Sequence, residues 1–188
     1  MSSSPNPALP TRYTGVAIAM HWLMAVLIVG AFGVGTYMVG LKLSPTKLQL
    51  YSWHKWAGVT IFVLLWARLV WRLGHPAPAL PSTMPVWQQQ VAGALHVVLY
   101  LLMIAVPLSG WLMSSAKGFQ TVWFGVLPIP DLLDKNEALG DFLKNVHLFL
   151  TWSLAALVAA HVGAALKHHV IDRDDVLARM LPFLRRTG

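Results

Sequence analysis

The chain contains no cysteine, and only 11% of its 188 residues are charged. The first absence excludes disulfides, thiolate metal sites and cysteine-ligated iron–sulfur clusters. The second, together with a hydrophobic content of 56%, excludes an ordinary soluble domain. No basic run is interleaved with aromatic residues, so we expect no nucleic-acid partner despite the net charge of +7. The composition predicts an integral membrane protein in contact with lipid.

Long apolar runs make up most of the sequence, and each is long enough to cross a bilayer as one helix. Little remains outside them, so we expect an all-α fold, with residues 1–188 forming a single transmembrane domain built as a four-helix bundle. Asp134 followed by Glu137 is typical of a capping box and predicts a short helix from about Lys135 that leads into the last span. The predicted spans are at about 16–41, 48–73, 90–113 and 146–167.

The distribution of basic residues predicts the orientation in the membrane. Four spans place both termini on one side, and the positive-inside rule assigns the more basic side to the cytoplasm. Counting Lys and Arg together favours the side of the termini slightly, so we predict cytoplasmic termini in a bacterial inner membrane. The terminal side carries Arg12, Arg68, Arg72, Lys167, Arg173, Arg179, Arg185 and Arg186, and the other side carries Lys42, Lys47, Lys55, Lys117, Lys135 and Lys144.

Two histidines lie inside the last apolar run, His147 and His161. Their separation of fourteen residues corresponds to about 21 Å of helical rise and roughly four turns, so they share one face near opposite membrane surfaces. Ionisable residues inside a membrane are costly, which favours a functional interpretation over a structural one. The pattern therefore indicates two cofactors, one above the other.

The other histidines can be sorted by depth along the predicted spans. At the outer level, His54 on the second span faces His147. At the inner level, His161 has two candidate partners, His21 and His96. A bis-histidine haem needs one imidazole from each side of a flat ring, which two facing helices supply. We prefer His21, because it and His54 then play matching roles on the first two helices.

His96 keeps three interpretations: a structural hydrogen-bond donor, a quinone ligand, or the true inner axial ligand. Any single membrane histidine is often only a donor between helices. Four histidines at two matched depths are much harder to explain in that way.

Several motifs together resemble the bacterial cytochrome b(561) family of four-helix di-haem membrane proteins. They are MHW with His21, WHK with His54, RLVWRLGHPAP after the second span, ALHVVLYLLMIAVPLSGW with His96, WFG in the third loop, and HVGAALKHH followed by LARMLP. The resemblance extends from about Tyr13 to Pro182. It is to superoxide-oxidising members of the family, and it implies two b-type haems and electron exchange with membrane quinone.

The resemblance also implies roles for particular residues. It supports His21 with His161 as axial ligands of the inner haem, and His54 with His147 as those of the outer haem. The implied reaction oxidises superoxide on the periplasmic side and reduces ubiquinone near the cytoplasmic side. His96 and His168 match positions at the quinone end.

Arg68 and Arg72 lie on the inner side, where they are candidates for pairing with haem propionates. The alternative for both is that they extend towards the membrane surface in the usual positive-inside pattern.

Two other functions use the same histidines. In one, the chain is the cytochrome b membrane subunit that passes electrons between quinone and a partner dehydrogenase or hydrogenase. In the other, it is a metal-binding or transport protein without redox chemistry, which predicts no haem absorbance. A protein redox partner or a homo-oligomer is compatible with the sequence, although the short loops favour a chain that acts alone.

Overall fold

The computed structural model describes residues 12–81 and 84–184, and it has the predicted all-α architecture of four long helices. All four are long and apolar enough to cross a membrane. Arg185 and Arg186, counted above among the basic residues of the terminal side, lie outside the described residues. The helices are α1 (Gly15–Val39), α2 (Pro45–Gly74), α3 (Val86–Ala116) and α4 (Glu137–Lys167).

Short polar side chains cap three of these helices. The hydroxyl of Thr14 accepts from the amide of Ala17 at the start of α1, and Ser44 does the same at the start of α2, where Pro45 occupies the first turn. At the start of α4 the cap is Asn136 and not Asp134, so the predicted capping box is wrong.

The position of Asn136 explains this correction. Its backbone amide donates to the carbonyl of Ala116 at the end of α3, which fixes Asn136 at the point where α4 begins. Its side-chain oxygen then accepts from the amide of Leu139, at 3.0 Å. The short helix expected from about Lys135 and the last apolar run therefore form one continuous helix, α4.

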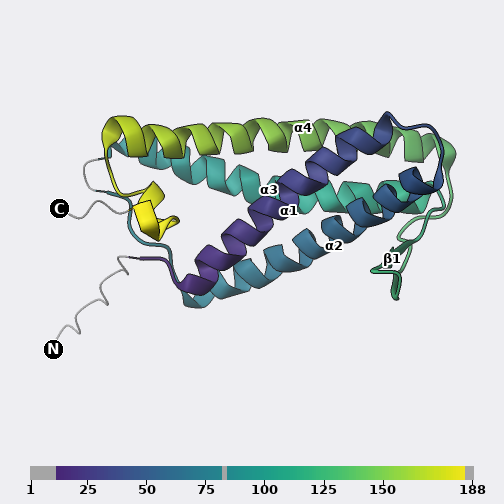
Figure 1. The fold of residues 1–188 in the computed structure, drawn as a ribbon, viewed down its shortest axis with the longest axis horizontal. Coiled ribbons are helices and arrows are strands. Elements are labelled where there is room, and N and C mark those ends of the chain that lie inside the picture. The colour runs from purple at the N-terminus through teal and green to yellow at the C-terminus, as the bar shows by residue number, and fades with distance from the viewer. Residues whose placement is uncertain (1–11, 82–83, 185–188) are drawn as a thin grey trace, which may run out of the picture.

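The helices pack mainly as two hairpins, α1 with α2 and α3 with α4, and α2 also contacts α3. Figure 1 shows α1 crossing the bundle obliquely, with both ends of the described chain at the same end of the bundle. Met24, Ile61 and Leu65 form a small buried core between α1 and α2. Large apolar side chains such as Val26 and Val70 stay exposed on the outside, as expected for helices surrounded by lipid.

A β-hairpin, absent from the sequence prediction, lies in the α3–α4 connection at the far end of the bundle (Figure 1). Strand β1 (Thr121–Trp123) pairs antiparallel with β2 (Leu127–Ile129). Phe124 and Gly125 turn the chain with φ of 50° and 72°, both in the left-handed region. Glycine adopts this conformation without strain, whereas Phe124 does so at some cost.

Three short helical turns follow α4 and cover the opposite end of the bundle (Figure 1). They are the π-turn η1 (His168–Asp172) and the 3₁₀ turns η2 (Leu177–Arg179) and η3 (Pro182–Leu184). The indole of Trp22 on α1 donates to the carbonyl of Met180 at 2.8 Å, which ties this C-terminal segment to the start of the bundle.

Candidate functional site

His54 on α2 and His147 on α4 face each other near the hairpin end of the bundle. Their ring centroids are 6.2 Å apart, with an interplanar angle of 89°. Imidazole nitrogens bind metals at about 2 Å, so two rings on opposite sides of one metal ion have centroids roughly 6 Å apart. The spacing of this outer pair therefore fits a shared metal.

The ring of His54 is oriented by the neighbouring helix α1. Its Nδ1 lies 3.0 Å from the carbonyl oxygen of Ala31. Because a carbonyl only accepts, Nδ1 carries the proton and Nε2 is left as a metal ligand. One turn later on α1 stands Gly35, where an added Cβ would lie only 3.0 Å from Cε1 of His54.

The ring of His147 is oriented in the same way by α3. Its Nδ1 lies 3.1 Å from the carbonyl oxygen of Val106 and 3.0 Å from the hydroxyl of Ser109. One turn after Val106 stands Gly110, where an added Cβ would lie 3.1 Å from Cε1 of His147. Each outer histidine thus donates to a backbone carbonyl of the neighbouring helix, and a glycine four residues after that carbonyl lies against its ring. Neither glycine, nor Ser109, was among the predicted site residues.

His161 on α4 lies close to two other histidines, His21 on α1 and His96 on α3. The ring centroids of His21 and His161 are 6.3 Å apart, and those of His96 and His161 are 5.2 Å apart. The first distance is close to that of the outer pair, whereas the second is shorter. His96 Nδ1 also pairs with the carbonyl of Ala92 on its own helix, at 2.6 Å.

Arg68 and Arg72 converge on one phenol close to the inner level. Arg68 Nε donates to the hydroxyl of Tyr100 at 3.1 Å, and Arg72 Nη1 donates to the same oxygen at 3.3 Å. Arg68 Nη1 also donates to the carbonyl of Ala17, one turn before His21. Arg68 therefore points into the bundle. Tyr100 was missed by the sequence analysis, although it lies one turn after His96.

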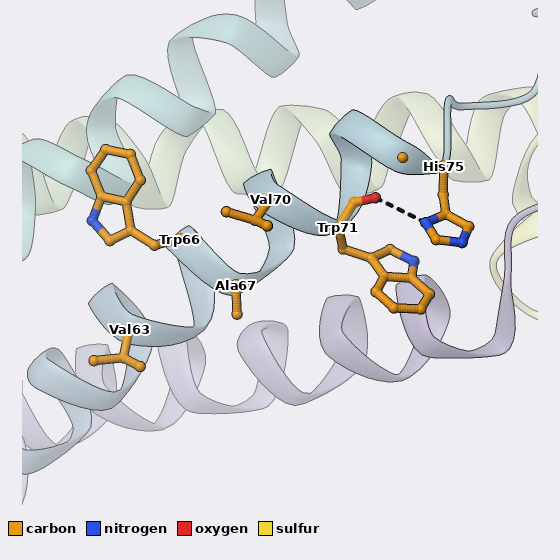
Figure 2. A pocket seen from close by; sticks show the side chains of 7 residues that line it. Val63, Trp66, Ala67, Val70, Trp71 and His75 are labelled. Carbon is orange, nitrogen blue, oxygen red and sulfur yellow. Dashed lines mark hydrogen bonds between the residues drawn. The ribbon is translucent and has the colours of Figure 1, made fainter.

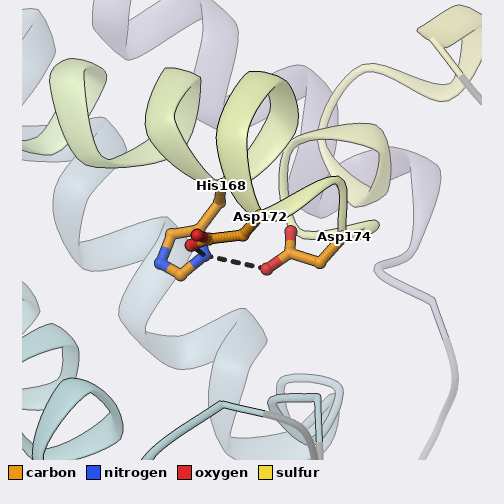
Figure 3. A group of neighbouring side chains, drawn as sticks. All are labelled: His168, Asp172 and Asp174. Carbon is orange, nitrogen blue, oxygen red and sulfur yellow. Dashed lines mark hydrogen bonds and ion pairs between the residues drawn. The ribbon is translucent and has the colours of Figure 1, made fainter.

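His168 lies beyond the inner histidines, at the start of η1. Its Nδ1 is 2.8 Å from Oδ2 of Asp174 and 3.0 Å from Oδ2 of Asp172 (Figure 3). Neither aspartate was among the predicted site residues. Asp172 lies one helical turn after His168 in η1, whereas Asp174 reaches His168 only because the chain reverses at Arg173.

Comparisons with known proteins identify the family. A family model described as prokaryotic cytochrome b561 matches residues 12–183. The chain belongs to this family. Cytochrome b561 homolog 2 of Escherichia coli (strain K12) is 38% identical over 174 residues, which cover 92% of each chain. Cytochrome b561 homolog 1 of the same strain is 31% identical over 91% of this chain and 97% of its own. A probable superoxide oxidase, CybB, of Yersinia pestis is 31% identical over 91% of this chain and 96% of its own.

Membership of the cytochrome b561 family makes the protein a multi-pass membrane b-type cytochrome that carries electrons. The family implies b-type haem, and the opposed histidine pairs fit that group. The hydrogen bonds to Nδ1 of His54 and His147 are those that keep Nε2 available to iron.

At the β-hairpin end of this cytochrome, some lysines pair with carboxylates and others donate to backbone carbonyls. Lys117 Nζ is held by Asp141 at 2.8 Å and by Glu137 at 3.2 Å. The hydrogen bond to Asp141 raises the pKa of Lys117. Lys55, next to His54, instead donates to a backbone carbonyl, that of Phe119. Carboxylates thus offset part of the positive charge on this side.

A shallow groove lies on α2 (Figure 2). In it the ring of His75 stacks on Trp71 with centroids 4.1 Å apart, and His75 Nδ1 pairs with the carbonyl of Trp71. The lining is mostly apolar, as expected for a surface in contact with lipid chains. None of the paired histidines lines this groove, which comprises Val63, Trp66, Ala67, Val70, Trp71, Gly74 and His75.

Proposed function

We propose that the protein is a di-haem superoxide:ubiquinone oxidoreductase of the bacterial inner membrane. His54 and His147 are the axial ligands of its outer haem, and His21 and His161 are those of its inner haem. The observation that carries the proposal is the presence of two histidine pairs at two depths, with centroid distances of 6.2 and 6.3 Å. The similarity to a probable superoxide oxidase supports superoxide as the electron donor.

When bound, b-type haem accepts and releases single electrons, which connects a one-electron donor with a two-electron quinone. The chain's own contribution is to hold the ligands and to place charge. α1 and α3 fix the rings of His54 and His147 through backbone carbonyls. Arg68 and Arg72, which both donate to the hydroxyl of Tyr100, would pair with the propionates of the inner haem.

On the outer side, superoxide is a small anion, so positive potential raises its local concentration. On this side Lys47 and Lys55 donate to the backbone carbonyls of Leu41 and Phe119. On the inner side, ubiquinone binds near His96 and His168. In this proposal residues 1–188 act as one transmembrane domain, and the distribution of basic residues assigns both termini to the cytoplasm.

The proposal is tested with detergent-purified protein. We expect two haems per chain by pyridine haemochrome, reduction of the haem by enzymatically generated superoxide, and quinol formation when ubiquinone is added. His147→Ala and His161→Ala should each retain one haem. Quinol formation that requires a co-purifying soluble subunit would instead favour the membrane-subunit function. A purified wild-type protein without haem absorbance would contradict both.

A further inference from the structure

The two outer histidines contact their neighbouring helices at similar backbone positions. The carbonyls that pair with the two rings belong to Ala31 on α1 and Val106 on α3. Each carbonyl is followed, four residues later, by a glycine that lies against the ring. The third residue after the carbonyl differs, because it is Val34 on α1 and Ser109 on α3. The surroundings of the two rings therefore differ by one hydroxyl group.

Ser109 is buried and forms a triangle of polar atoms with His147 and Val106. Its side chain is only 5% exposed. Its Oγ lies 2.8 Å from the carbonyl oxygen of Val106 and 3.0 Å from Nδ1 of His147. The third side of the triangle, from Nδ1 to the carbonyl oxygen, measures 3.1 Å. Exclusion of water strengthens hydrogen bonds in such a place.

The chemistry of the three groups determines where the protons lie. A carbonyl only accepts, so the hydroxyl of Ser109 donates to Val106, and its lone pairs are left for Nδ1 of His147. Because Nε2 is the proposed iron ligand, Nδ1 keeps its proton and shares it between the hydroxyl oxygen and the carbonyl oxygen. The ring of His147 thus has two acceptors. In the part of the chain that the structure describes, His54 has one, the carbonyl of Ala31.

A second acceptor at Nδ1 changes the ring as an iron ligand. Acceptors draw the Nδ1 proton away from the ring, which increases the electron density and basicity of Nε2. A more basic ligand stabilises oxidised iron relative to reduced iron, so hydrogen bonding to the ligand is one means by which a protein sets the potential of its haem. Ser109 would act on the outer haem in this way, through His147 and without touching the haem itself.

The surroundings of the inner pair favour the opposite effect. Arg68 donates to the carbonyl of Ala17, one turn before His21 on the same helix. The positive charge of a guanidinium stabilises the reduced state of a nearby haem, because reduction adds a negative charge. The two levels therefore differ in a sense that favours transfer of an electron from the outer haem to the inner one.

We propose that Ser109 is a positioning residue that lowers the reduction potential of the outer haem through His147. This inference rests on the proposed function, in which His147 is an axial ligand of that haem. When one electron passes inward, the outer iron is oxidised from ferrous to ferric and the inner iron is reduced from ferric to ferrous. The Nδ1 proton stays on His147 throughout.

A purely structural role for Ser109 is the alternative. Pro107 lies inside α3, and a serine hydroxyl that bonds back to a carbonyl of its own helix can bend the helix. In that role the hydroxyl shapes α3, and the potential of a haem that is fully bound does not depend on it.

The experiment is a redox titration of detergent-purified protein, followed by haem absorbance. The variants are Ser109→Ala, Ser109→Thr and Ser109→Val. Threonine and valine have the same shape and differ in the hydroxyl, so their comparison separates hydrogen bonding from packing. The matched control is Ser115→Ala, which removes a hydroxyl that is also buried on α3 and donates to the carbonyl of Trp111.

We expect two midpoint potentials in the wild type, of which one rises in Ser109→Ala and Ser109→Val. Only part of a hydrogen bond's net contribution differs between the two oxidation states, so the equilibrium constant for reduction should increase about threefold. At 59 mV for each tenfold change, this corresponds to about 30 mV. Ser109→Thr and Ser115→Ala should titrate like the wild type. The shift should persist in a His161→Ala background, which keeps only the outer haem.

Pyridine haemochrome identifies any variant that loses haem, and Ser109→Ala carries the test if the larger side chains do so. Wild-type potentials in Ser109→Ala with two haems bound would overturn this inference and leave the proposed function standing. Equal shifts in Ser109→Thr and Ser109→Val would show an effect of volume and contradict the role of the hydroxyl. Wild-type haem that superoxide does not reduce would instead overturn the proposed function.

Discussion

Gly35 and Gly110 occupy equivalent positions beside two different histidines. Each lies four residues after the carbonyl that receives the Nδ1 proton, Ala31 for His54 and Val106 for His147. A Cβ at either glycine would come within 3.1 Å of a ring carbon, closer than nine in ten real Cβ contacts. The missing side chain at these positions lets the imidazole approach the backbone of the neighbouring helix.

Replacing Gly35 by alanine should therefore displace the ring of His54 from its orientation. We expect Gly35→Ala to lower the haem content from two per chain towards one, measured by pyridine haemochrome. Gly33→Ala is the matched control, because nothing lies within 4 Å of a Cβ at Gly33 on the same helix. Equal haem content in the two variants would show that Gly35 does not control the outer site.

Depth could be predicted from the sequence, whereas rotation and lateral contacts could not. A fixed rise per residue converts the spacing of His147 and His161 into two membrane levels without knowledge of the neighbours. Neither the choice between His21 and His96 nor the glycine positions can be read in this way, because they depend on how helices rotate against one another. Asp174 reaches His168 only through a left-handed residue, Arg173, for which composition gives no signal.

At the scale of elements, the β-hairpin is attached to α2 by two indole groups. Trp56 Nε1 donates to the carbonyl of Val122 at 2.6 Å, and Trp123 Nε1 donates to the hydroxyl of Thr60 at 3.2 Å. These bonds cross between segments more than sixty residues apart. They hold the hairpin on α2, next to the helix turn that carries His54.

Loss of one of these bonds should loosen the hairpin without removing haem. A net hydrogen bond contributes about 1 kcal/mol, so Trp56→Phe should raise the equilibrium constant for local opening about fivefold. Faster amide hydrogen exchange over residues 119–130 would report this change. Trp87→Phe, at an exposed tryptophan on α3, is the control. Unchanged exchange in Trp56→Phe would mean that other contacts hold the hairpin.

At the scale of the whole molecule, the absence of cysteine permits a direct test of orientation. Leu43, in the α1–α2 connection, is 82% exposed, and Leu80, in the α2–α3 connection, is 39% exposed. With cytoplasmic termini, Leu43→Cys faces the periplasm and Leu80→Cys faces the cytoplasm. A membrane-impermeant maleimide should label the first in intact spheroplasts and the second only after lysis. The cysteine-free parent controls for background, and the reverse pattern would invert the topology.

The helices pack as two hairpins, α1 with α2 and α3 with α4, and the histidine pairs connect these two halves. Each proposed ligand pair takes one ring from the α1–α2 hairpin and one from the α3–α4 hairpin. Each iron would therefore cross-link halves of the chain that are made one after the other. Haem insertion would then be a step of assembly as much as of activation. A cell short of haem would accumulate loosely joined hairpins, so haem supply would set the abundance of the mature protein.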